Sequence, residues 1–177
     1  MKTIYALLIG AVLLGTMIDR PAEAAIEPTI HLLIKRRSAP MIIESRDAMR
    51  DRIARAHGID PIEFKAMEQI ESGGKNTAMR FEPGQMNRAR RLAPKAGIAE
   101  LRYLATSHCS MQVMGWWEVV LKLPRGTLKN QEECYEVAAH VRAKCEEKRP
   151  GNGAACYNGS QKYAVLVQAV MRKTKKG

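Results

Sequence analysis

The chain has 177 residues, with 29 Lys and Arg against 18 Asp and Glu and a net charge of +11. This length suffices for one domain with a hydrophobic core after removal of a leader. In an exported protein this positive charge favours binding to an anionic polymer or to the cell envelope, so no nucleic-acid partner is expected. The alternative is that the basic residues form ordinary solvated faces. The charge gathers at Arg88, Arg90, Arg91 and Lys95 and in a basic tail over residues 173–177.

Residues 1–24 are predicted to be a signal peptide. Lys2 precedes an apolar run over residues 4–18, and Ala22-Glu23-Ala24 forms a small-x-small cleavage site. The run is short for a membrane span, so we expect cleavage after Ala24 and a secreted or periplasmic protein without a stable membrane span. An uncleaved N-terminal anchor is the alternative.

A linker or arm over residues 25–44 is expected to lead into the folded domain, residues 45–172. The arm contains two prolines, a basic pair and apolar residues without a clear period. A helix over 46–57 should follow, capped by Ser45 and ended by Gly58.

The next predicted helix carries an unusual carboxylate. Asp60 supplies an N-cap, Pro61 the first helical position and Glu63 the acid three residues after the cap. At about 100° per residue, the apolar side chains form one arc, and Glu71 falls inside it. The arc consists of Ile62, Phe64, Ala66, Met67 and Ile70. Burial favours the protonated form of a carboxyl group, and a protonated carboxyl can act as a general acid. Glu71 is therefore the catalytic candidate. The alternative is a solvated carboxylate at the end of a helix.

The rest of the chain also reads as mostly helical, with almost no alternating strand pattern and no internal repeat. Residues 75–95 are predicted to be a loop that lines a cleft. Further helices are expected over 96–106, 110–122, 130–148 and from 154 to 173, the last with a break near Asn158-Gly159. The predicted fold class is therefore mostly α.

Four cysteines, an even number in an exported chain, predict disulfides. They are Cys109, Cys134, Cys145 and Cys156. A helix over 130–148 would separate Cys134 from Cys145 by roughly 16 Å, whereas a bridge needs about 7 Å or less. Of the two remaining connectivities we favour Cys109–Cys134 with Cys145–Cys156, since the second pair closes a short turn between helices. A zinc site competes, but no C-x-x-C spacing occurs and the histidines are scattered, so neither metal nor cofactor is expected.

Three segments occur in an order that resembles one enzyme family. They are Arg55-Ala56-His57-Gly58-Ile59-Asp60-Pro61 with Phe64 to Ser72, then Ser107-His108-Cys109-Ser110-Met111-Gln112-Val113-Met114-Gly115, then Ala154-Ala155-Cys156-Tyr157-Asn158-Gly159 with Tyr163. They resemble the three motifs of soluble-lytic-transglycosylase-type catalytic domains. Arg80-Phe81-Glu82-Pro83 is similar to a motif of phage-type members. The resemblance covers about residues 45–172.

The resemblance implies a lysozyme-like α domain that cleaves the β-1,4 bond between N-acetylmuramic acid and N-acetylglucosamine in peptidoglycan. Glu71 would act first as acid and then as base, and the muramic 6-hydroxyl would close a 1,6-anhydro ring without water. One carboxylate suffices, in contrast to most glycosidases. No aspartate follows Asp60, and Glu82 is the possible second carboxylate, with a structural contact to Arg80 as its alternative.

The same resemblance implies a set of substrate-binding residues. They are Ser72, Ser107, Met111, Gln112, Tyr157, Asn158 and Tyr163. The amides of Gln112 and Asn158 can both donate and accept hydrogen bonds, as sugar groups require. Met111 would form a polarizable wall for a sugar ring, although core packing is the alternative for Met111 and Tyr157.

Two departures from the family pattern stand out. Cys109 occupies a position where the family usually has glycine, the residue suited to close approach or unusual backbone angles. Residues 84–106 match no motif, so the far wall of the cleft is not predicted.

The leading hypothesis is a secreted, monomeric lytic transglycosylase that acts on peptidoglycan glycan strands. One alternative is a hydrolytic muramidase (lysozyme) in which Glu82 activates water. Another is a non-catalytic, basic wall-binding component of a secretion or conjugation machine or of a phage particle.

Overall fold

The computed structural model describes residues 44–176, which belong to one compact unit. The predicted signal peptide and the predicted arm up to residue 43 lie outside the described residues. Within the described part, no helix combines the length and apolarity needed to cross a bilayer.

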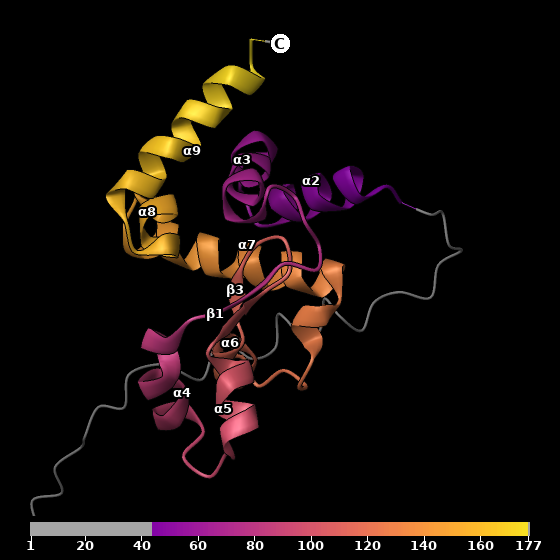
Figure 1. The fold of residues 1–177 in the computed structure, drawn as a ribbon. Helices are drawn as coiled ribbons and strands as arrows, with labels where there is room; N and C mark the ends of the chain where they lie inside the picture. The colour runs from indigo at the N-terminus through magenta and orange to yellow at the C-terminus, as the bar shows by residue number, and fades with distance from the viewer. Residues whose placement is uncertain (1–43, 177) are drawn as a thin grey trace, which may run out of the picture. The chain divides into compact units, whose positions relative to one another are not determined.

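The described residues form mostly α-helices around a small sheet (Figure 1). The helices are α2 (Arg46–Ala56), α3 (Pro61–Ser72), α4 (Met86–Leu92), α5 (Ile98–Leu104), α6 (Trp116–Val120), α7 (Gln131–Lys148), α8 (Gly153–Asn158) and α9 (Gln161–Thr174). The strands are β1 (Met79–Phe81), β2 (Thr106–His108) and β3 (Val113–Met114), and the 3-10 helices are η1 (Pro83–Gln85) and η2 (Thr127–Lys129).

The capping signals place the first two helices correctly. The Ser45 side chain accepts a hydrogen bond from the Ala48 amide, and Asp60 accepts one from the Ile62 amide at 2.9 Å. Gly58 and Gly73 follow the two helices with φ of 69° and 63°, the left-handed conformation that ends a helix. The predicted boundaries of α2 and α3 are therefore confirmed to within a residue.

Helix α7 organises the main core. It packs against α2 and α8, and α3 packs against α2 and α9 (Figure 1). The core of this part contains fully buried side chains from four helices. They are Ile53, Phe64, Met67, Tyr135, Val137 and Val167.

A buried ionic cluster ties α2, α3 and α7 together. Glu68 is 4% exposed and forms ion pairs with Arg46 and with Arg50, the latter at 3.1 Å, while Tyr135 donates its hydroxyl to the same carboxylate. Burial alone would raise the pKa of Glu68, but hydrogen bonds from Ser110, Tyr135 and Arg46 outweigh it, so the pKa is lowered. The cluster therefore holds a charged carboxylate inside the fold.

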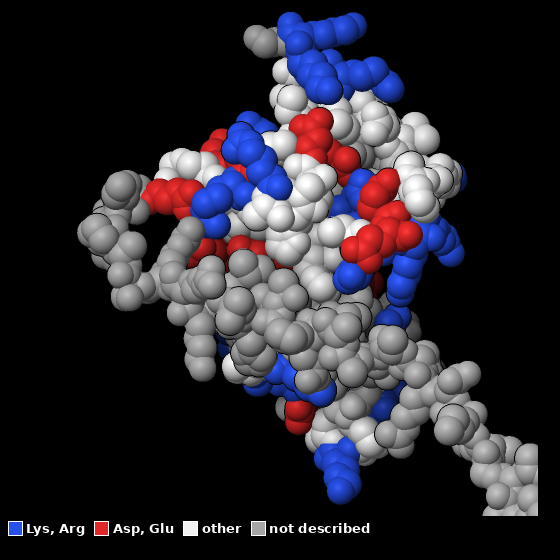
Figure 2. All heavy atoms as spheres, turned by 180° about the vertical axis from the view of Figure 1, so that it is seen from behind, with Lys and Arg blue, Asp and Glu red and all other residues white. Residues whose placement is uncertain are grey.

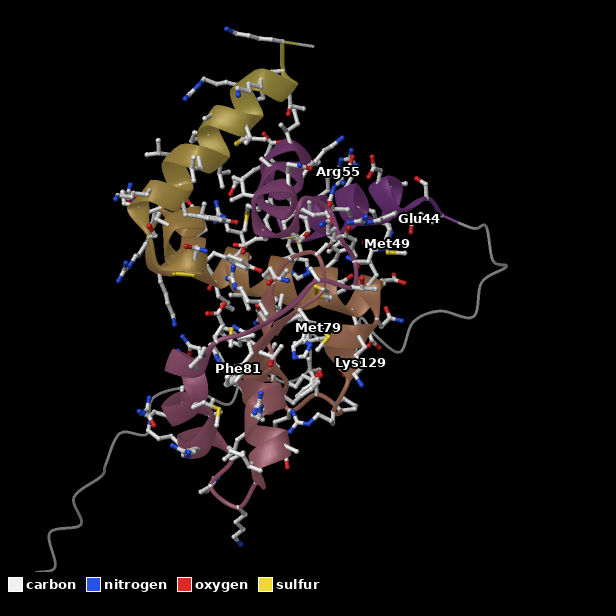
Figure 3. The ribbon with its side chains drawn as sticks, viewed as in Figure 1. Glu44, Met49, Arg55, Met79, Phe81 and Lys129 are labelled. Atoms are coloured by element: carbon white, nitrogen blue, oxygen red, sulfur yellow. A yellow bond between two sulfur atoms is a disulfide. The ribbon has the colours of Figure 1, made fainter. Side chains whose placement is uncertain are left out.

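The three-stranded sheet was not expected from the sequence. β2 pairs antiparallel with β1, where Ser107 faces Arg80, and with β3, where Ser107 faces Met114. The side chains of Met79 and Phe81 on β1 are exposed and are labelled in Figure 3. The predicted loop over residues 75–95 thus contains β1 and α4 as well as turns.

The predicted helix over 110–122 is also wrong in its first half. Cys109 and Gln112 have φ of 57° and 50°, which no α-helix accommodates, and only Trp116–Val120 is helical. Gly115 lies between them and the helix, and a Cβ there would come within 2.5 Å of the Tyr103 carbonyl oxygen. Close packing against Tyr103 therefore leaves no room for a side chain at Gly115, the N-cap of α6.

Helices α4, α5 and α6 build a second, smaller cluster, and α4 and α5 lie at the opposite end of the described unit from α2 and α3 (Figure 1). Its buried members are Ala89, Leu101, Leu104, Ala105 and Trp116. Glu118 of α6 is buried and accepts hydrogen bonds from the Tyr103 hydroxyl and from the amides of Gly126 and Leu128. Glu118 therefore fixes the turn that leads to η2 and α7.

The two disulfides match the favoured pairing. Cys109 is bonded to Cys134, with Cα atoms 6.6 Å apart, and Cys145 to Cys156, with Cα atoms 5.5 Å apart. All four cysteines are thus unavailable to zinc. Within residues 44–176, no group of three or more His, Cys, Asp or Glu is placed to hold a metal ion.

Candidate active site

Glu71 lies in the last turn of α3 and faces a cleft of about 690 Å³. Two groups of elements line the cleft. One group is α7 and α8, and the other is the sheet with α4 and α6. Its lining residues are Glu71, Arg80, Glu82, Gln85, Arg88, Ser107, Gln112, Val113, Met114, Trp116, Trp117, Val141, Lys144, Cys145, Lys148, Cys156, Tyr157, Asn158 and Gly159.

The surroundings of Glu71 favour its protonated form. Burial raises the pKa of Glu71, and the Tyr163 hydroxyl, the Asn158 amide and the charge of Arg80 offset this only in part. Asn158 approaches with its Nδ2 at 3.4 Å from Oε1 of Glu71, a long hydrogen bond. A carboxyl in this setting can deliver a proton at a higher pH than a free glutamic acid.

Two tyrosines lie near this carboxyl and remain neutral. The Tyr157 hydroxyl donates to the Met111 carbonyl oxygen at 2.9 Å. The Tyr163 hydroxyl is buried and makes no hydrogen bond of normal geometry within residues 44–176. Burial and the charge of Glu71 raise the pKa of both tyrosines, so they offer hydroxyl groups rather than phenolate.

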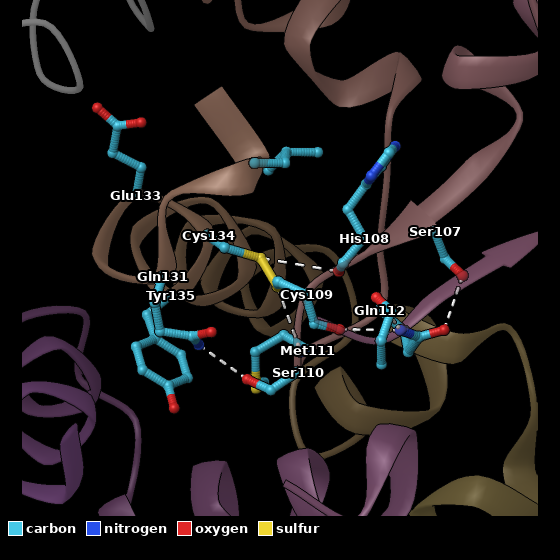
Figure 4. The surroundings of a disulfide bond; sticks show 12 residues. Ser107, His108, Cys109, Ser110, Met111, Gln112, Gln131, Glu133, Cys134 and Tyr135 are labelled. Carbon is cyan, nitrogen blue, oxygen red and sulfur yellow. Dashed lines mark hydrogen bonds between the residues drawn. A yellow bond between two sulfur atoms is a disulfide. The ribbon is translucent and has the colours of Figure 1, made fainter. Parts of the chain in front are cut away.

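The turn over residues 109–112 joins the sheet to the cleft (Figure 4). Gln112 accepts a hydrogen bond from the Ser107 hydroxyl at 2.8 Å and donates from Nε2 to the carbonyl oxygens of Cys109, at 2.8 Å, and Ala78, at 3.2 Å. Cys109 adopts the positive φ that explains a glycine in the related motif, and its disulfide to Cys134 attaches this turn to α7. The Gln112 amide therefore shapes the cleft wall.

Most of the predicted site residues meet in this cleft. Those that line it are Glu71, Glu82, Ser107, Gln112, Tyr157 and Asn158. Ser72, Met111 and Tyr163 are not among the lining residues. Ser72 donates its hydroxyl to the Ser110 carbonyl oxygen at 2.8 Å and so connects the end of α3 to the 109–112 turn.

Met111 departs from the sequence expectation. Its side chain is 0% exposed, so it packs in the core and forms no wall for a sugar ring. Its contribution to the cleft is the backbone carbonyl that holds Tyr157.

Glu82 faces the same cleft as Glu71 and pairs with Arg80, two residues before it. The contact with Arg80 that was the alternative role for Glu82 is thus present. The position of Glu82 in the cleft is also compatible with a role as a second carboxylate. The negative charge of Glu82 contributes to the raised pKa of Glu71.

Sequence reasoning missed the far wall of the cleft. Arg88 of α4 lies with its guanidinium carbon 3.6 Å from the ring centre of Trp116, and the rings of Trp116 and Trp117 are 4.7 Å apart. Lys144 and Lys148 of α7 add positive charge to the cleft. The basic residues around Arg88 were visible in the sequence. The interpretation of 110–122 as a buried helix correctly placed Trp116 in the core, but it did not indicate that Trp116 and Trp117 also line the cleft.

Comparison with known proteins gives one informative result. No protein-family model and no curated protein matches the sequence. Among solved structures, the chain is similar to the endolysin of the Burkholderia phage AP3, with a TM-score of 0.52 and 20% identity over 80% of this chain and 74% of that chain. At this identity the likeness concerns the fold alone. The described residues are mostly α-helical and carry two disulfides, as expected from the sequence.

Proposed function

We propose that this protein is an exported lytic transglycosylase that cleaves peptidoglycan glycan strands between N-acetylmuramic acid and N-acetylglucosamine. The observation that carries the proposal is the Glu71 carboxyl, whose pKa is raised by burial at the wall of an open cleft. The likeness to a phage endolysin supports a wall-degrading enzyme in general. The motif order around Glu71, Gln112 and Asn158 favours the transglycosylase class.

The reaction needs one proton carrier. Protonated Glu71 gives its proton to the glycosidic oxygen as the bond from that oxygen to the anomeric carbon breaks. The resulting carboxylate then takes the proton of the muramic 6-hydroxyl while this oxygen bonds to the anomeric carbon. Glu71 ends protonated again, and no water is consumed. Neutral Tyr157 and the Asn158 amide contribute polar groups beside the carboxyl without adding a competing charge.

A hydrolytic muramidase is the second candidate. Glu82 lines the same cleft, and in that mechanism it would activate a water molecule against the anomeric carbon. Its ion pair with Arg80 favours a structural role.

Two matched variants separate these candidates. Glu71→Gln should lower the rate of wall digestion by about 10²–10⁴-fold, since general acid–base catalysis contributes on that order. Glu82→Gln should digest purified wall at a rate close to wild type. Loss of activity in both variants would favour the muramidase, and an active Glu71→Gln would overturn both. Circular dichroism of each variant checks that the fold is retained.

A non-catalytic wall-binding role makes a different prediction, namely no wall digestion by the wild-type chain. The raised pKa of Glu71 argues for chemistry, since a binding domain gains nothing from a half-buried carboxyl that lacks a cationic partner in direct contact within residues 44–176. Export is part of the proposal, and mass spectrometry of the secreted protein should find an N-terminus after Ala24.

A further inference from the structure

We propose that the outer face of α9 docks on a membrane surface that contains anionic lipid. The outer face consists of Lys162, Val165, Leu166, Ala169 and Lys173 on one side of α9, together with Lys176, which follows the end of the helix at Thr174. None of these residues lines the active-site cleft. The inference is therefore independent of the proposed enzymatic activity.

The first observation is apolar surface that the fold does not use. Tyr163, Val167 and Met171 are buried and form the inner side of α9, which packs on α3. Val165 and Leu166 lie on the other side and are 61% and 53% exposed. A surface helix normally has one apolar stripe, so Val165 and Leu166 form an additional apolar pair on the solvent side of α9.

The second observation is the charge around this pair. After Glu147 the sequence has no acidic residue as far as Gly177, whereas it has a series of basic ones. These are Lys148, Arg149, Lys162, Arg172, Lys173, Lys175 and Lys176. Figure 2 shows Lys and Arg side chains gathered at the end of the molecule where α9 finishes. The carboxylates near α9 come from other elements. Asp60 lies 3.9 Å from the Lys175 ammonium group, and Glu63 and Glu146 line a second pocket together with Val165 and Arg172.

Apolar side chains flanked by Lys and Arg are the composition of a helix that lies in a membrane interface. The aliphatic groups enter the boundary between headgroups and acyl chains, and the basic groups meet lipid phosphates. A soluble polyanion would use the charges but not Val165 and Leu166. The combination therefore favours an anionic lipid surface.

The test measures partition of the full chain onto phosphatidylglycerol–phosphatidylcholine vesicles and onto pure phosphatidylcholine vesicles. Every variant carries the same N-terminal segment, so differences between variants report α9. The apolar variant is Val165→Ser with Leu166→Ser, and its matched control is Ile98→Ser, a 63% exposed apolar residue on α5. The charge variant is Lys173→Gln with Lys176→Gln, and its control is Arg91→Gln with Lys95→Gln.

We expect the wild-type chain to prefer the anionic vesicles. The apolar variant should lose at least roughly tenfold in partition. The charge variant should lose roughly 30-fold, from about 1 kcal/mol for each basic residue at the surface. Both controls should bind as the wild type does. Equal binding to both vesicle types would overturn the proposal. So would unchanged binding by the apolar variant, which would assign the face to a polyanion.

Discussion

Glu68 and Glu71 lie three residues apart on α3, yet their surroundings shift their pKa values in opposite directions. Glu68 meets the guanidinium group of Arg46 and the hydroxyl of Tyr135, which stabilise its charge. Glu71 meets mostly neutral partners such as the Asn158 amide, so burial dominates. The same helix thus supplies one carboxylate that holds the fold and one that is suited to proton transfer.

Glu71→Gln should leave the protein at least as stable as the wild type at pH 7. The folded pKa of Glu71 lies above its unfolded value of about 4.3, so the folded state binds the extra proton and wild-type stability falls as pH rises through this window. Glutamine has no charge to desolvate. Thermal unfolding at pH 7 and pH 4 measures this effect. The advantage of the variant should shrink at pH 4, and a variant clearly less stable at pH 7 would contradict the assignment.

Glu68→Gln should have the opposite effect. Removal of its charge takes the α3 partner away from the buried Arg50, which keeps its ion pairs with Asp47 and Asp51. We therefore expect a loss of about 1–3 kcal/mol, the cost of removing one partner of a buried hydrogen-bonded group. The pKa of Glu68 is lower in the folded than in the unfolded protein. Its contribution to the free energy of unfolding is therefore fully present above the unfolded-state pKa of this carboxyl, and it is lost as the pH falls through the folded-state pKa.

Urea unfolding at pH 7 measures this loss. Glu147→Gln is the control, since Glu147 is exposed and pairs with Lys144 at the surface, where ion pairs contribute about 0–1 kcal/mol. Equal losses for the two variants would show that the cluster around Glu68 does not stabilise the fold.

Among the elements, α8 is attached to its neighbour by a covalent bond as well as by packing. It is one of the shortest helices, it carries Tyr157 and Asn158, and Cys145–Cys156 attaches it to α7. Both cysteines line the cleft. The position of the polar groups near Glu71 thus depends on this disulfide.

Replacing both Cys145 and Cys156 with serine should therefore affect stability and activity together. The disulfide closes a short loop, for which the loss is about 2–3 kcal/mol, and a freed α8 should also lower wall digestion at a temperature where the fold persists. Denaturant unfolding and wall digestion measure the two effects. Unchanged digestion by this variant would show that α8 holds its place without the bond.

The elements that the sequence predicted well are those with local signals. Caps at Ser45 and Asp60 and a helical period define α2 and α3. The cysteine spacing along α7 excluded one disulfide connectivity, and the short turn closed by Cys145–Cys156 favoured the pairing that the structure has. The sheet was not predicted because its strands have only two or three residues each, too few to show an alternating pattern. Its central strand β2 also pairs with β1, which is remote in sequence, as Ser107 does with Arg80. The ionic cluster around Glu68 was not predicted either, because its partner Tyr135 lies on another helix and is remote in sequence.

At the scale of the whole molecule, the cleft brings an acid and a basic, aromatic wall into one space. Glu71 comes from α3, whereas Arg88 and Trp117 come from the side formed by α4 and α6. A glycan strand with neutral sugars and anionic peptide stems would meet both. Because burial raises the pKa of Glu71, wall digestion should decline on the alkaline side as this acid loses its proton.

The most direct test of the central claim is mass spectrometry of the fragments released from purified peptidoglycan by the wild-type protein. If Glu71 acts alone as acid and then base, the fragments should end in 1,6-anhydromuramic acid and be lighter by one water than hydrolysis products. Fragments that end only in reducing muramic acid would contradict this account and assign the cleft to hydrolysis.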